Sequence, residues 1–511
     1  LAIKVGMGKR TNTILQSAFF SLAKVMPAEE AIKYMKDAAE HSYAKKGMDV
    51  VEKNWNAIDV GANAYKKIDV PASWATAEDD KVDAKLEGRP ETVKVVKNIL
   101  NPIGKMDGYS LPVSAFADLP HWDETKCIQC NNCAYVCPHA TIRPFALTEE
   151  EVKAAPAGAR LVDVKAGKGK GVYKYMMAVS PLDCMGCGVC VGVCPTQAIT
   201  MVPQEQELPE QEVWNYMVDH VSEKKDMQDN TVKGSQFHKP LLEFSGSCAG
   251  CAETSYARLV TQLFGDRMYI SNATGCSSIW GGPAATSPYT VTAEGRGPAW
   301  ANSLFEDNAE HGLGMYTAQA VIRESLANKV KEVMEKTTCD ERKAACQTWL
   351  DTYNDGEANK AATKALIENL EAKVCCDTVK DILSKKEYLS KKSVWIFGGD
   401  GWAYDIGFGG VDHVLAQNKD VNVFVFDTEV YSNTGGQASK ASNIGQVAQF
   451  AAAGKETKKK SLAEIAMSYG YIYVAQVAMG ANQAQTLKAI AEAEAYHVPS
   501  LLIGYALFEI H

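Results

Sequence analysis

The 511-residue sequence lacks long hydrophobic runs and an excess of basic charge. No apolar stretch reaches the roughly 18 residues of a membrane-spanning helix. The formal net charge of −9 disfavours a nucleic-acid surface. The opening residues, Leu1 to Val5, include no initiator methionine and do not resemble a signal sequence. We therefore expect a fragment of a larger globular protein, with about three or four domains.

Cysteine, in contrast, is abundant, with 15 residues. Eight of these form two copies of one pattern, in which three cysteines are separated by two residues each and a fourth, followed by proline, comes three residues later. The first copy consists of Cys127, Cys130, Cys133 and Cys137, and the second of Cys184, Cys187, Cys190 and Cys194. This pattern is typical of paired [4Fe-4S] clusters, in which the fourth cysteine binds the neighbouring cluster.

The pattern predicts two crossed ligand sets. One cluster would be held by Cys127, Cys130, Cys133 and Cys194, and the other by Cys184, Cys187, Cys190 and Cys137. Disulfides or paired zinc sites are alternatives, but zinc sites use two pairs of ligands rather than this repeated spacing. Thiolates that hold iron indicate a reducing compartment. We expect the cytoplasm, or a hydrogenosome-like organelle if the source is eukaryotic.

Periodicity and composition divide the chain into four parts. Residues 1–68 have apolar positions at helical spacing and are interpreted as the tail of a preceding α/β domain. Residues 69–120 contain several prolines and predict a linker. Residues 121–205 hold the paired cysteine motifs and predict an α+β ferredoxin-like domain, and residues 206–511 form the last part.

The last part alternates strand-like and helix-like segments. The strand candidates are 393–397, 421–426, 471–477 and 500–504, and the helix candidates are 403–417 and 482–496. This alternation predicts an α/β domain with a parallel sheet and helices on both faces. Residues 317–390 predict a helical insertion. Its cysteines, Cys339, Cys346, Cys375 and Cys376, match no ligand spacing and are interpreted as ordinary helix residues.

A basic segment interrupts the ferredoxin-like part at residues 145–178. Its cations between residues 160 and 174 are Arg160, Lys165, Lys168, Lys170 and Lys174, against one acid, Asp163. A basic surface here would attract an acidic electron carrier. A solvated loop is the alternative, and it is the one that a charge run alone favours.

Two strand ends in the last part carry oxygen ligands. The first strand ends in Gly399-Asp400-Gly401, and Thr428 and Val430 follow the next. Because the carboxyl ends of parallel strands meet at one edge of a sheet, Asp400 and Thr428 are expected to converge there. A carboxylate, a hydroxyl and a carbonyl oxygen suit Mg²⁺. Glycines let the backbone approach a diphosphate closely.

A Gly-Asp-Gly sequence followed by an asparagine after the next strand, here Asn433, resembles the thiamine diphosphate motif. By that resemblance, Asp400, Thr428 and the carbonyl of Val430 would hold Mg²⁺ and the diphosphate, with Gly399 and Gly401 beside the cofactor.

Three more cysteines, Cys248, Cys251 and Cys276, lie between the ferredoxin motifs and the Gly-Asp-Gly sequence. Their spacing fits a zinc site, part of a cluster, or a structural role.

Taken together, the motifs resemble the pyruvate:ferredoxin oxidoreductase family over nearly the whole chain. The matching segments are 101–117, the two ferredoxin motifs, 234–254, 275–280, 295–302 and 399–436. The resemblance implies oxidative decarboxylation of pyruvate with coenzyme A to acetyl-CoA and CO₂. Electrons would pass from thiamine diphosphate through three [4Fe-4S] clusters to ferredoxin or flavodoxin.

The resemblance also implies roles for single residues. Cys248, Cys251 and Cys276 would bind a cluster beside the thiamine ring, Gly275, Ser277 and Ser278 would pack against that ring, and Cys276 and Asn433 would act at the reaction centre. The family's fourth ligand of this cluster falls near Phe508, so a truncated or misread terminus, an impaired cluster, and His511 as a substitute are all considered.

Two alternatives to this function stay open. One is a 2-oxoacid:ferredoxin oxidoreductase with another substrate, such as 2-oxoglutarate, because the family's substrate pocket lies largely outside this chain. The other is a non-catalytic electron-transfer subunit, against which the intact Asp400, Thr428 and Asn433 argue. By the same resemblance, a homodimer or a larger homo-oligomer is expected.

Overall fold

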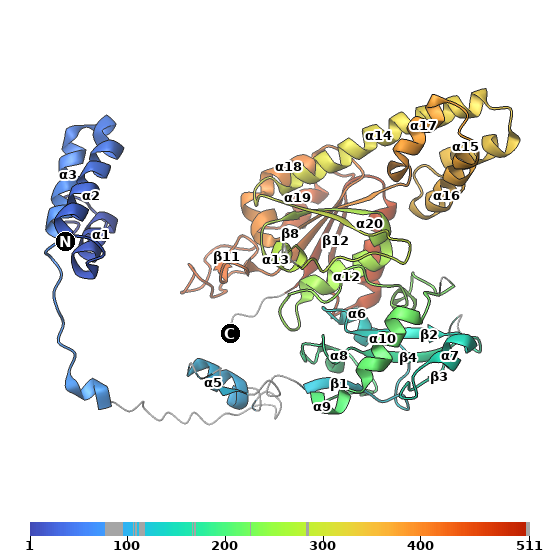
Figure 1. Ribbon diagram of the computed structural model, residues 1–511, viewed down its shortest axis with the longest axis horizontal. Coiled ribbons are helices and arrows are strands. Elements are labelled where there is room, and N and C mark those ends of the chain that lie inside the picture. Colours follow the sequence, from blue (N-terminus) through green and yellow to red (C-terminus); the bar gives the residue numbers. More distant parts are fainter. Residues whose placement is uncertain are drawn as a thin grey trace. The chain divides into compact units, whose positions relative to one another are not determined.

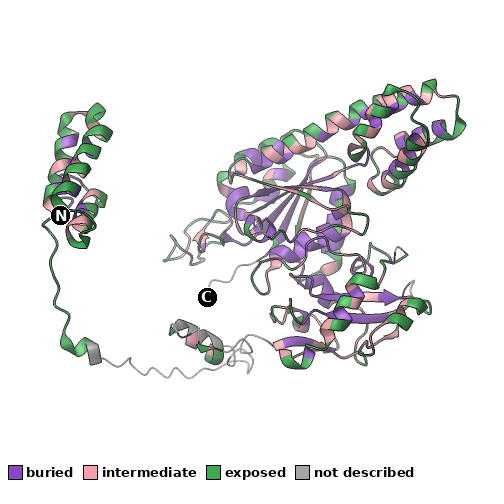
Figure 2. Ribbon diagram, in the orientation of Figure 1, coloured by how far each residue is buried: buried purple, intermediate pink, exposed green. Residues whose placement is uncertain are grey.

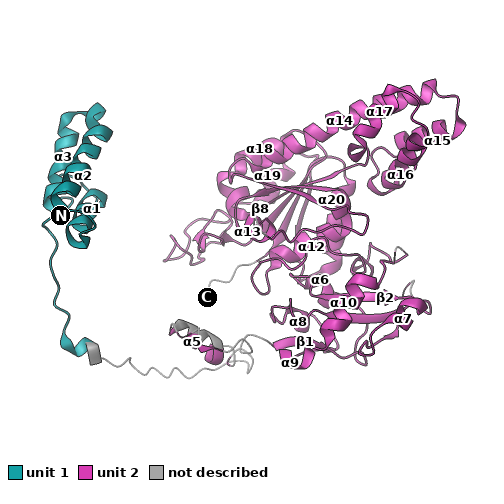
Figure 3. Cartoon of the chain, in the orientation of Figure 1, with its two compact units in different colours: residues 1–89 teal, residues 90–511 magenta. Residues whose placement is uncertain are grey.

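The computed structural model describes residues 1–76, 93, 96–105, 107, 110–111, 118–165, 167, 170–224, 226–282 and 286–506. The chain forms two compact units, residues 1–89 and residues 90–511 (Figure 3). No helix within these ranges combines the length and apolar character that crossing a membrane requires.

The first unit is built from helices. They are α1 (Asn12–Ala23), α2 (Ala28–Tyr43), η1 (Ala44–Lys46), α3 (Met48–Gly61) and η2 (Ala72–Thr76). Helices α1 and α3 pack closely at Gly61 of α3. A Cβ on that residue would lie only 2.7 Å from the carbonyl oxygen of Ile14 in α1, so the close approach needs glycine. Residues 1–68, expected to be the tail of an α/β domain, contain helices joined by turns and no strand. The described part of the predicted linker contains η3 (Val96–Leu100) and α5 (Asn101–Gly104).

The predicted ferredoxin-like domain has two small antiparallel sheets. Strand β1 (Asp118–Trp122) pairs with β5 (Ile199–Pro203), and β2 (Ile142–Leu147), β4 (Lys174–Val179) and β3 (Val162–Asp163) form a second sheet in that order. The helices are α6 (Asn132–Val136), α7 (Glu149–Ala154), α8 (Val189–Gly192), α9 (Gln204–Glu207) and α10 (Glu210–His220). Helix α10 adds Val213, Trp214 and Met217 to this core, so the packing extends beyond residue 205.

The second half of the chain contains a six-stranded parallel sheet with the order β12-β13-β9-β8-β6-β7. Its strands are β6 (Met268–Ala273), β7 (Ala299–Ser303), β8 (Ser393–Gly399), β9 (Asn422–Asp427), β12 (Tyr473–Val477) and β13 (Ser500–Tyr505). The four predicted strands are present, whereas the sequence analysis did not identify β6 and β7.

Helices cover both faces of this sheet (Figures 1 and 2). One face carries α12 (Ala252–Phe264), α13 (Cys276–Gly281) and α20 (Gln483–Ala495), and the other carries α14 (Asn308–Lys336), α18 (Phe408–Ala416) and α19 (Leu462–Met467). The pleat of β8 explains both cores: Trp395 and Phe397 point into the first, and Val394 and Ile396 into the second. The predicted α/β domain is confirmed.

The outer half of α14 belongs to the helical insertion, with α15 (Asp340–Asp351), α16 (Gly356–Ala372) and α17 (Asp377–Ser384), which share a separate core. One interpretation of this region is corrected. Cys346 lies within α15, but Cys339 and Cys376 are the residues that precede α15 and α17, and Cys375 lies in the connection before α17. The remaining elements are α11 (Val232–Ser235), η6 (Gly265–Arg267), η7 (Lys386–Tyr388), η8 (Gly401–Ile406), β10 (Val430–Tyr431) and β11 (Gln437–Ala438).

Candidate active site and cluster sites

The three predicted Mg²⁺ ligands lie together at the carboxyl edge of the parallel sheet. Asp400 directly follows β8, and Thr428 directly follows β9. The Thr428 Oγ1 lies 2.7 Å from Asp400 Oδ1 and 2.9 Å from the carbonyl oxygen of Val430. Adjacent oxygens of a Mg²⁺ octahedron are about 2.9 Å apart, since each lies about 2.1 Å from the metal. These oxygens therefore fit Mg²⁺ without a large rearrangement.

Burial sets the protonation of Asp400. The residue is only 1% exposed, and burial raises the pKa of its carboxyl to about 7, although hydrogen bonds from Ser439 and Thr428 act in the opposite direction. A carboxylate that has lost its hydration is poorly stable as an anion unless a cation approaches it. The site therefore favours a positive charge beside Asp400.

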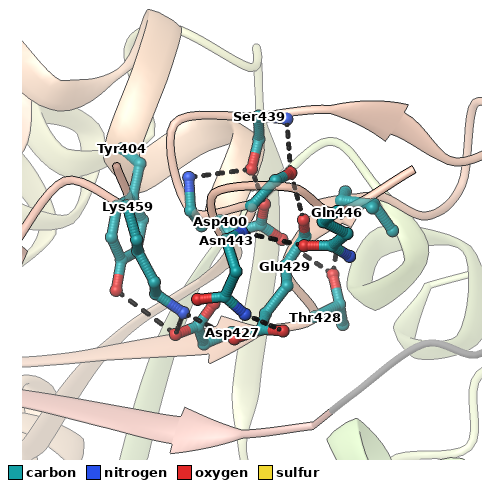
Figure 4. A network of polar contacts seen from close by, with 12 residues as sticks. Asp400, Tyr404, Asp427, Thr428, Glu429, Ser439, Asn443, Gln446 and Lys459 are labelled. Atoms are coloured by element: carbon teal, nitrogen blue, oxygen red, sulfur yellow. Dashed lines mark hydrogen bonds and ion pairs between the residues drawn. The ribbon is translucent and has the colours of Figure 1, made fainter. Parts of the chain in front are cut away.

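A second group of charged residues surrounds the backbone before Val430 (Figure 4). Lys459 Nζ donates to Asp427 over 2.6 Å and to Glu429 over 3.0 Å, and Asn443 donates to Glu429 over 2.9 Å. The backbone of Glu429 is left-handed, with a φ of 64°. Such a conformation is costly for a residue with a side chain and needs support from its surroundings. Lys459 and Asn443 supply that support, and so position the carbonyl of Val430.

The glycines of the Gly-Asp-Gly sequence are explained by contacts. A Cβ on Gly401 would come within 2.5 Å of the Tyr431 ring, so a larger residue would push the β10–β11 hairpin away. A Cβ on Gly399 would meet only the Phe426 carbonyl oxygen, at 4.0 Å, which leaves space beside the strand end. Asn433 is exposed in the turn between β10 and β11, outside the hydrogen-bonded group of Asp400.

Cys276 begins α13, next to the same hairpin. Its Sγ lies 3.3 Å from the Ser432 hydroxyl. Burial raises the pKa of Cys276 to about 12, and the nearby charges of Glu253, Cys251 and Cys248 contribute. Cys248 and Cys251 thus lie near enough to Cys276 to affect its charge.

Ser277 and Ser278 fix the turn that leads into α13. Asn272 donates to the Ser277 hydroxyl over 2.8 Å, and the Ser278 hydroxyl lies 3.0 Å from the Gly275 nitrogen and 2.9 Å from its oxygen. The predicted fourth ligand position near residue 508 lies outside the described residues.

The first crossed set of thiols surrounds a small cavity. Cys127, Cys130, Cys133 and Cys194 line it together with Trp122 and Met177. Backbone N–H groups donate to two of the sulfurs, from Gln129 to Cys127 over 3.3 Å and from Ala198 to Cys194 over 3.2 Å. Such hydrogen bonds stabilise the negative charge of a thiolate-bound cluster.

The second crossed set adjoins the first. Burial raises the pKa of Cys190, and the charges of Cys137, Cys187 and Cys184 raise it further. No group of three Cys, His, Asp or Glu residues in the described chain lies close enough to bind one metal ion. A mononuclear zinc site needs thiolates about 4 Å apart, because Zn–S is about 2.3 Å. The thiols of the first set, which surround a cavity, instead suit a larger cluster.

The ferredoxin-like domain packs directly on the domain of the parallel sheet. The Tyr135 hydroxyl donates to the Gln483 carbonyl and the Ser255 hydroxyl to the Val136 carbonyl, each over 2.9 Å. At the cluster sites, a Cβ on Gly250 would lie 3.9 Å from the Cβ of Cys187. The loop between Cys248 and Cys251 therefore lies against the second crossed set, and the Gly250 backbone lowers the pKa of Cys187.

The basic segment makes contacts within its own domain. Arg160 donates to the Trp122 carbonyl, Lys165 to the Cys127 carbonyl, and Lys174 to Asp163. These contacts tie three of the five cations to groups of their own domain, and Lys168 lies outside the described residues.

Sequence analysis did not identify Ser439, Asn443, Lys459 or Glu429 as site residues. Ser439, Asn443 and Lys459 follow no motif spacing, and only the loop after β11 brings them to the strand ends. Glu429 lies between the predicted ligands Thr428 and Val430. Asp427 could have been predicted as a site residue, since it is a carboxylate at the end of a predicted strand.

Two family models match parts of the chain. A 4Fe-4S dicluster domain matches residues 126–198, and the C-terminal TPP-binding domain of thiamine pyrophosphate enzymes matches residues 382–503. Both matches agree with the predicted domain types.

Curated relatives match nearly the whole chain. A pyruvate-flavodoxin oxidoreductase from Enterobacter agglomerans and a pyruvate:ferredoxin oxidoreductase from Moorella thermoacetica are each 49% identical, over 99% of this chain and 45% of the relative. A mitochondrial pyruvate dehydrogenase [NADP(+)] from Euglena gracilis is 45% identical, over 98% of this chain and 29% of the relative.

Among solved structures, a 2-oxoglutarate:ferredoxin oxidoreductase from Magnetococcus marinus matches 52% of this chain and 64% of its own. Its identity of 15% and TM-score of 0.29 are too low to carry an argument. The chain spans about half the length of the bacterial relatives, and it belongs to the family of the pyruvate-flavodoxin and pyruvate:ferredoxin oxidoreductases.

Proposed function

We propose that the protein containing this chain oxidises pyruvate with coenzyme A to acetyl-CoA and CO₂ and delivers the electrons to ferredoxin or flavodoxin. The observation that carries this proposal is the continuity of the sites. The hairpin that follows Val430 contacts Cys276 through Ser432, and the loop after Cys248 contacts Cys187. Cofactor site and thiol groups thus form one connected series.

The residues fit the implied cofactors. Asp400, Thr428 and the carbonyl of Val430 would hold Mg²⁺ with a diphosphate, and Gly399 would leave room beside them. Bound thiamine diphosphate supplies the carbon nucleophile and the electron sink for decarboxylation, and [4Fe-4S] clusters carry electrons one at a time.

The order of the thiol groups supports a direction for electron flow. Cys248, Cys251 and Cys276 would hold the cluster next to the cofactor. The set that includes Cys187 comes second, because Gly250 contacts it. The set that includes Cys127 comes last, and the neighbouring Ile128 is 50% exposed. An acceptor would therefore dock near Cys127.

The names of the relatives support one substrate and more than one acceptor. Pyruvate is favoured because the bacterial and Euglena relatives carry it in their names. The acceptors in those names differ, so NADP⁺ belongs among the tests. A reducing compartment and a homo-oligomer, which is usual for the family, are parts of the same proposal.

The test uses the native full-length protein under anaerobic conditions, with ferredoxin, flavodoxin or NADP⁺ as the acceptor. We expect reduction to require both pyruvate and coenzyme A, with 2-oxoglutarate giving little. Reduction with 2-oxoglutarate but not with pyruvate would show that the substrate is another 2-oxoacid. If no oxoacid supports reduction, the chain is better explained as part of an electron-transfer subunit.

A substitution connects the activity to the site. Asp400→Asn removes the charge and keeps the shape, and we expect activity to fall by more than about 100-fold, since the outer partners of metal ligands alone are typically worth roughly 10–100-fold. The matched control is Asp412→Asn on α18, where the carboxylate accepts a hydrogen bond from Tyr469. If the two substitutions lower activity equally, Asp400 is not a residue of the cofactor site.

A further inference from the structure

Two adjacent cysteines in the helical insertion form an exposed dithiol. Cys375 and Cys376 are both exposed, and their sulfurs lie 3.9 Å apart. They lie in the connection before α17 and in a helical region with a separate core. No step of the proposed reaction uses them.

Each thiol faces a group that stabilises its thiolate. The guanidinium of Arg342 donates to the Cys375 Sγ over 3.1 Å. Cys376 immediately precedes α17, and backbone N–H groups of Val379 and Thr378 lower the pKa of its thiol, with a further contribution from Cys375. Thiolates are the nucleophilic form of cysteine, and cations and helix N-termini favour them.

Arg342 is fixed in place independently of the thiols. It is 5% exposed and also donates to the Asn369 side chain over 2.9 Å and to the Lys373 carbonyl over 2.9 Å. The guanidinium is therefore anchored to α16 and to the chain that follows it. Its position beside Cys375 does not depend on a mobile side chain.

Two lysines lie near Cys376. The pKa values of Lys336 and Lys380 are raised chiefly by Glu332 and Asp377, and the charge of Cys376 adds to the effect. Both acids are neutralised by these ion pairs. The two lysines therefore offset the two carboxylates, and the guanidinium of Arg342 supplies the positive charge beside the dithiol.

We propose that Cys375 and Cys376 are a reversible oxidation site for peroxides. The Cys376 thiolate attacks hydrogen peroxide, the O–O bond breaks, and sulfenic acid and hydroxide form. The Cys375 thiol then attacks that sulfur, an S–S bond forms, and water leaves. One peroxide thus accepts the two electrons that the dithiol loses.

The product would be easy to reduce. Neighbouring Cα atoms are about 3.8 Å apart across a trans peptide, below the usual range of about 4.4–6.8 Å for disulfides. A strained disulfide is readily reduced by small thiols. The site therefore suits a repeated cycle of oxidation and reduction.

The first test is a pulse of iodoacetamide on the anaerobic full-length holoprotein at pH 7, with residue-resolved mass spectrometry. Cys339 is the internal control, because it is exposed and precedes α15 as Cys376 precedes α17. We expect Cys376 to react at least about threefold faster than Cys339. Equal rates would overturn the proposal. Lys336→Gln with Lys380→Gln should slow Cys376 and leave Cys339 unchanged.

The second test adds hydrogen peroxide before the alkylation. We expect the tryptic peptide 374–380, which contains both cysteines, to lose two hydrogens and to regain them with a small thiol. Cys375→Ser should leave a sulfenic acid that dimedone traps on Cys376. Persistence of both free thiols while other exposed cysteines oxidise, or oxidation directly to sulfonic acids, would contradict the proposal.

Discussion

The Thr428 hydroxyl lies 2.7 Å from the Asp400 carboxylate, although 28 positions separate the two residues in the sequence. The two strands that end at these residues, β8 and β9, are neighbours in the sheet. The same hydroxyl lies 2.9 Å from the Val430 carbonyl oxygen. Three oxygens from two neighbouring strand ends therefore lie within hydrogen-bonding distance of one another, at a spacing that suits a divalent cation.

The binding of Mg²⁺ should depend on pH through Asp400. Burial raises the pKa of this carboxyl to about 7, so a proton competes with the metal below that pH. We expect Mg²⁺-dependent binding of thiamine diphosphate, measured by calorimetry on the full-length protein, to weaken by up to about tenfold per pH unit below 7. Affinity should level off above pH 7, and a flat profile from pH 5.5 to 8.5 would contradict this assignment.

The raised pKa of Asp400 also affects the stability of the protein without Mg²⁺, and here a higher pH is unfavourable. Its folded state holds the proton of Asp400 more tightly than the unfolded state does, so this group's contribution to the free energy of unfolding falls as pH rises from about 4 to 7. Added Mg²⁺ should therefore raise the melting temperature more at pH 8 than at pH 5.5.

The crossed ligand sets predict a specific pattern of iron loss. Cys194→Ser should remove one cluster, or about four iron atoms. Cys194→Ser combined with Cys127→Ser should cost no more iron than either single substitution, because both residues line the same cavity. Cys194→Ser combined with Cys184→Ser should cost two clusters. Iron analysis of the anaerobic protein measures this, and the reverse pattern would mean that the sets do not cross.

Lys459 should stabilise the cofactor edge of the sheet. Lys459→Met leaves Asp427 and Glu429 without their cation, and both carboxylates are buried. We expect a loss on the order of 2 kcal/mol in the free energy of unfolding, below the roughly 3–5 kcal/mol of fully buried pairs because Lys459 is partly exposed. Chemical denaturation measures this loss. Lys458→Met, one residue away and exposed, is the control and should change little.

Glu151 should stabilise the ferredoxin-like domain above acidic pH. Burial raises the pKa of Glu151, but hydrogen bonds from Lys224, Thr148 and Ser222 lower it to about 2. The stabilisation is therefore complete above the unfolded pKa of 4.5 and is lost as pH falls toward 2. Glu151→Gln should cost about 2 kcal/mol at pH 7, less than the full pKa difference would give, because Glu151 is partly exposed and solvent screens its ion pair.

The control for Glu151→Gln comes from the same helical turn. Glu149 and Glu150 also lie in the first turn of α7, but only Glu151 forms the capping box with Thr148. Glu150→Gln should therefore have little effect in urea unfolding at pH 7. A cost as large as that of Glu151→Gln would assign the effect to the helix dipole rather than to Lys224.

The sequence contained the information for much of the fold. Strands β8, β9, β12 and β13 were predictable because parallel strands buried on both faces are continuous apolar runs. Strand β6 was missed because its run includes the polar Ser271 and Asn272. Their side chains are satisfied by buried partners, with Ser271 bonded to Asn308 and Asn272 to Ser277.

Some residues of the candidate site could be predicted from the sequence, and others could not. Asp400, Thr428 and the cysteines follow fixed spacings, so the sequence alone indicated them. Lys459 and Asn443 lie on a loop whose path depends on tertiary packing. Cys375 and Cys376 were interpreted as helix residues because nothing local indicated where α16 ends and α17 begins; the hydrogen bond from Arg342, 33 positions earlier, was not visible in the sequence.

The position of β13 between β12 and β9 constrains the order of folding. Strand β12 pairs only with β13 among the described strands, so it cannot join the sheet before residues 500–505 are in place. Until then, β9 presents an unpaired apolar edge beside the finished β8. A nascent chain would expose that edge during the synthesis of more than 70 residues, and such edges invite association with other chains. The step most vulnerable to misassembly is therefore the late insertion of one strand.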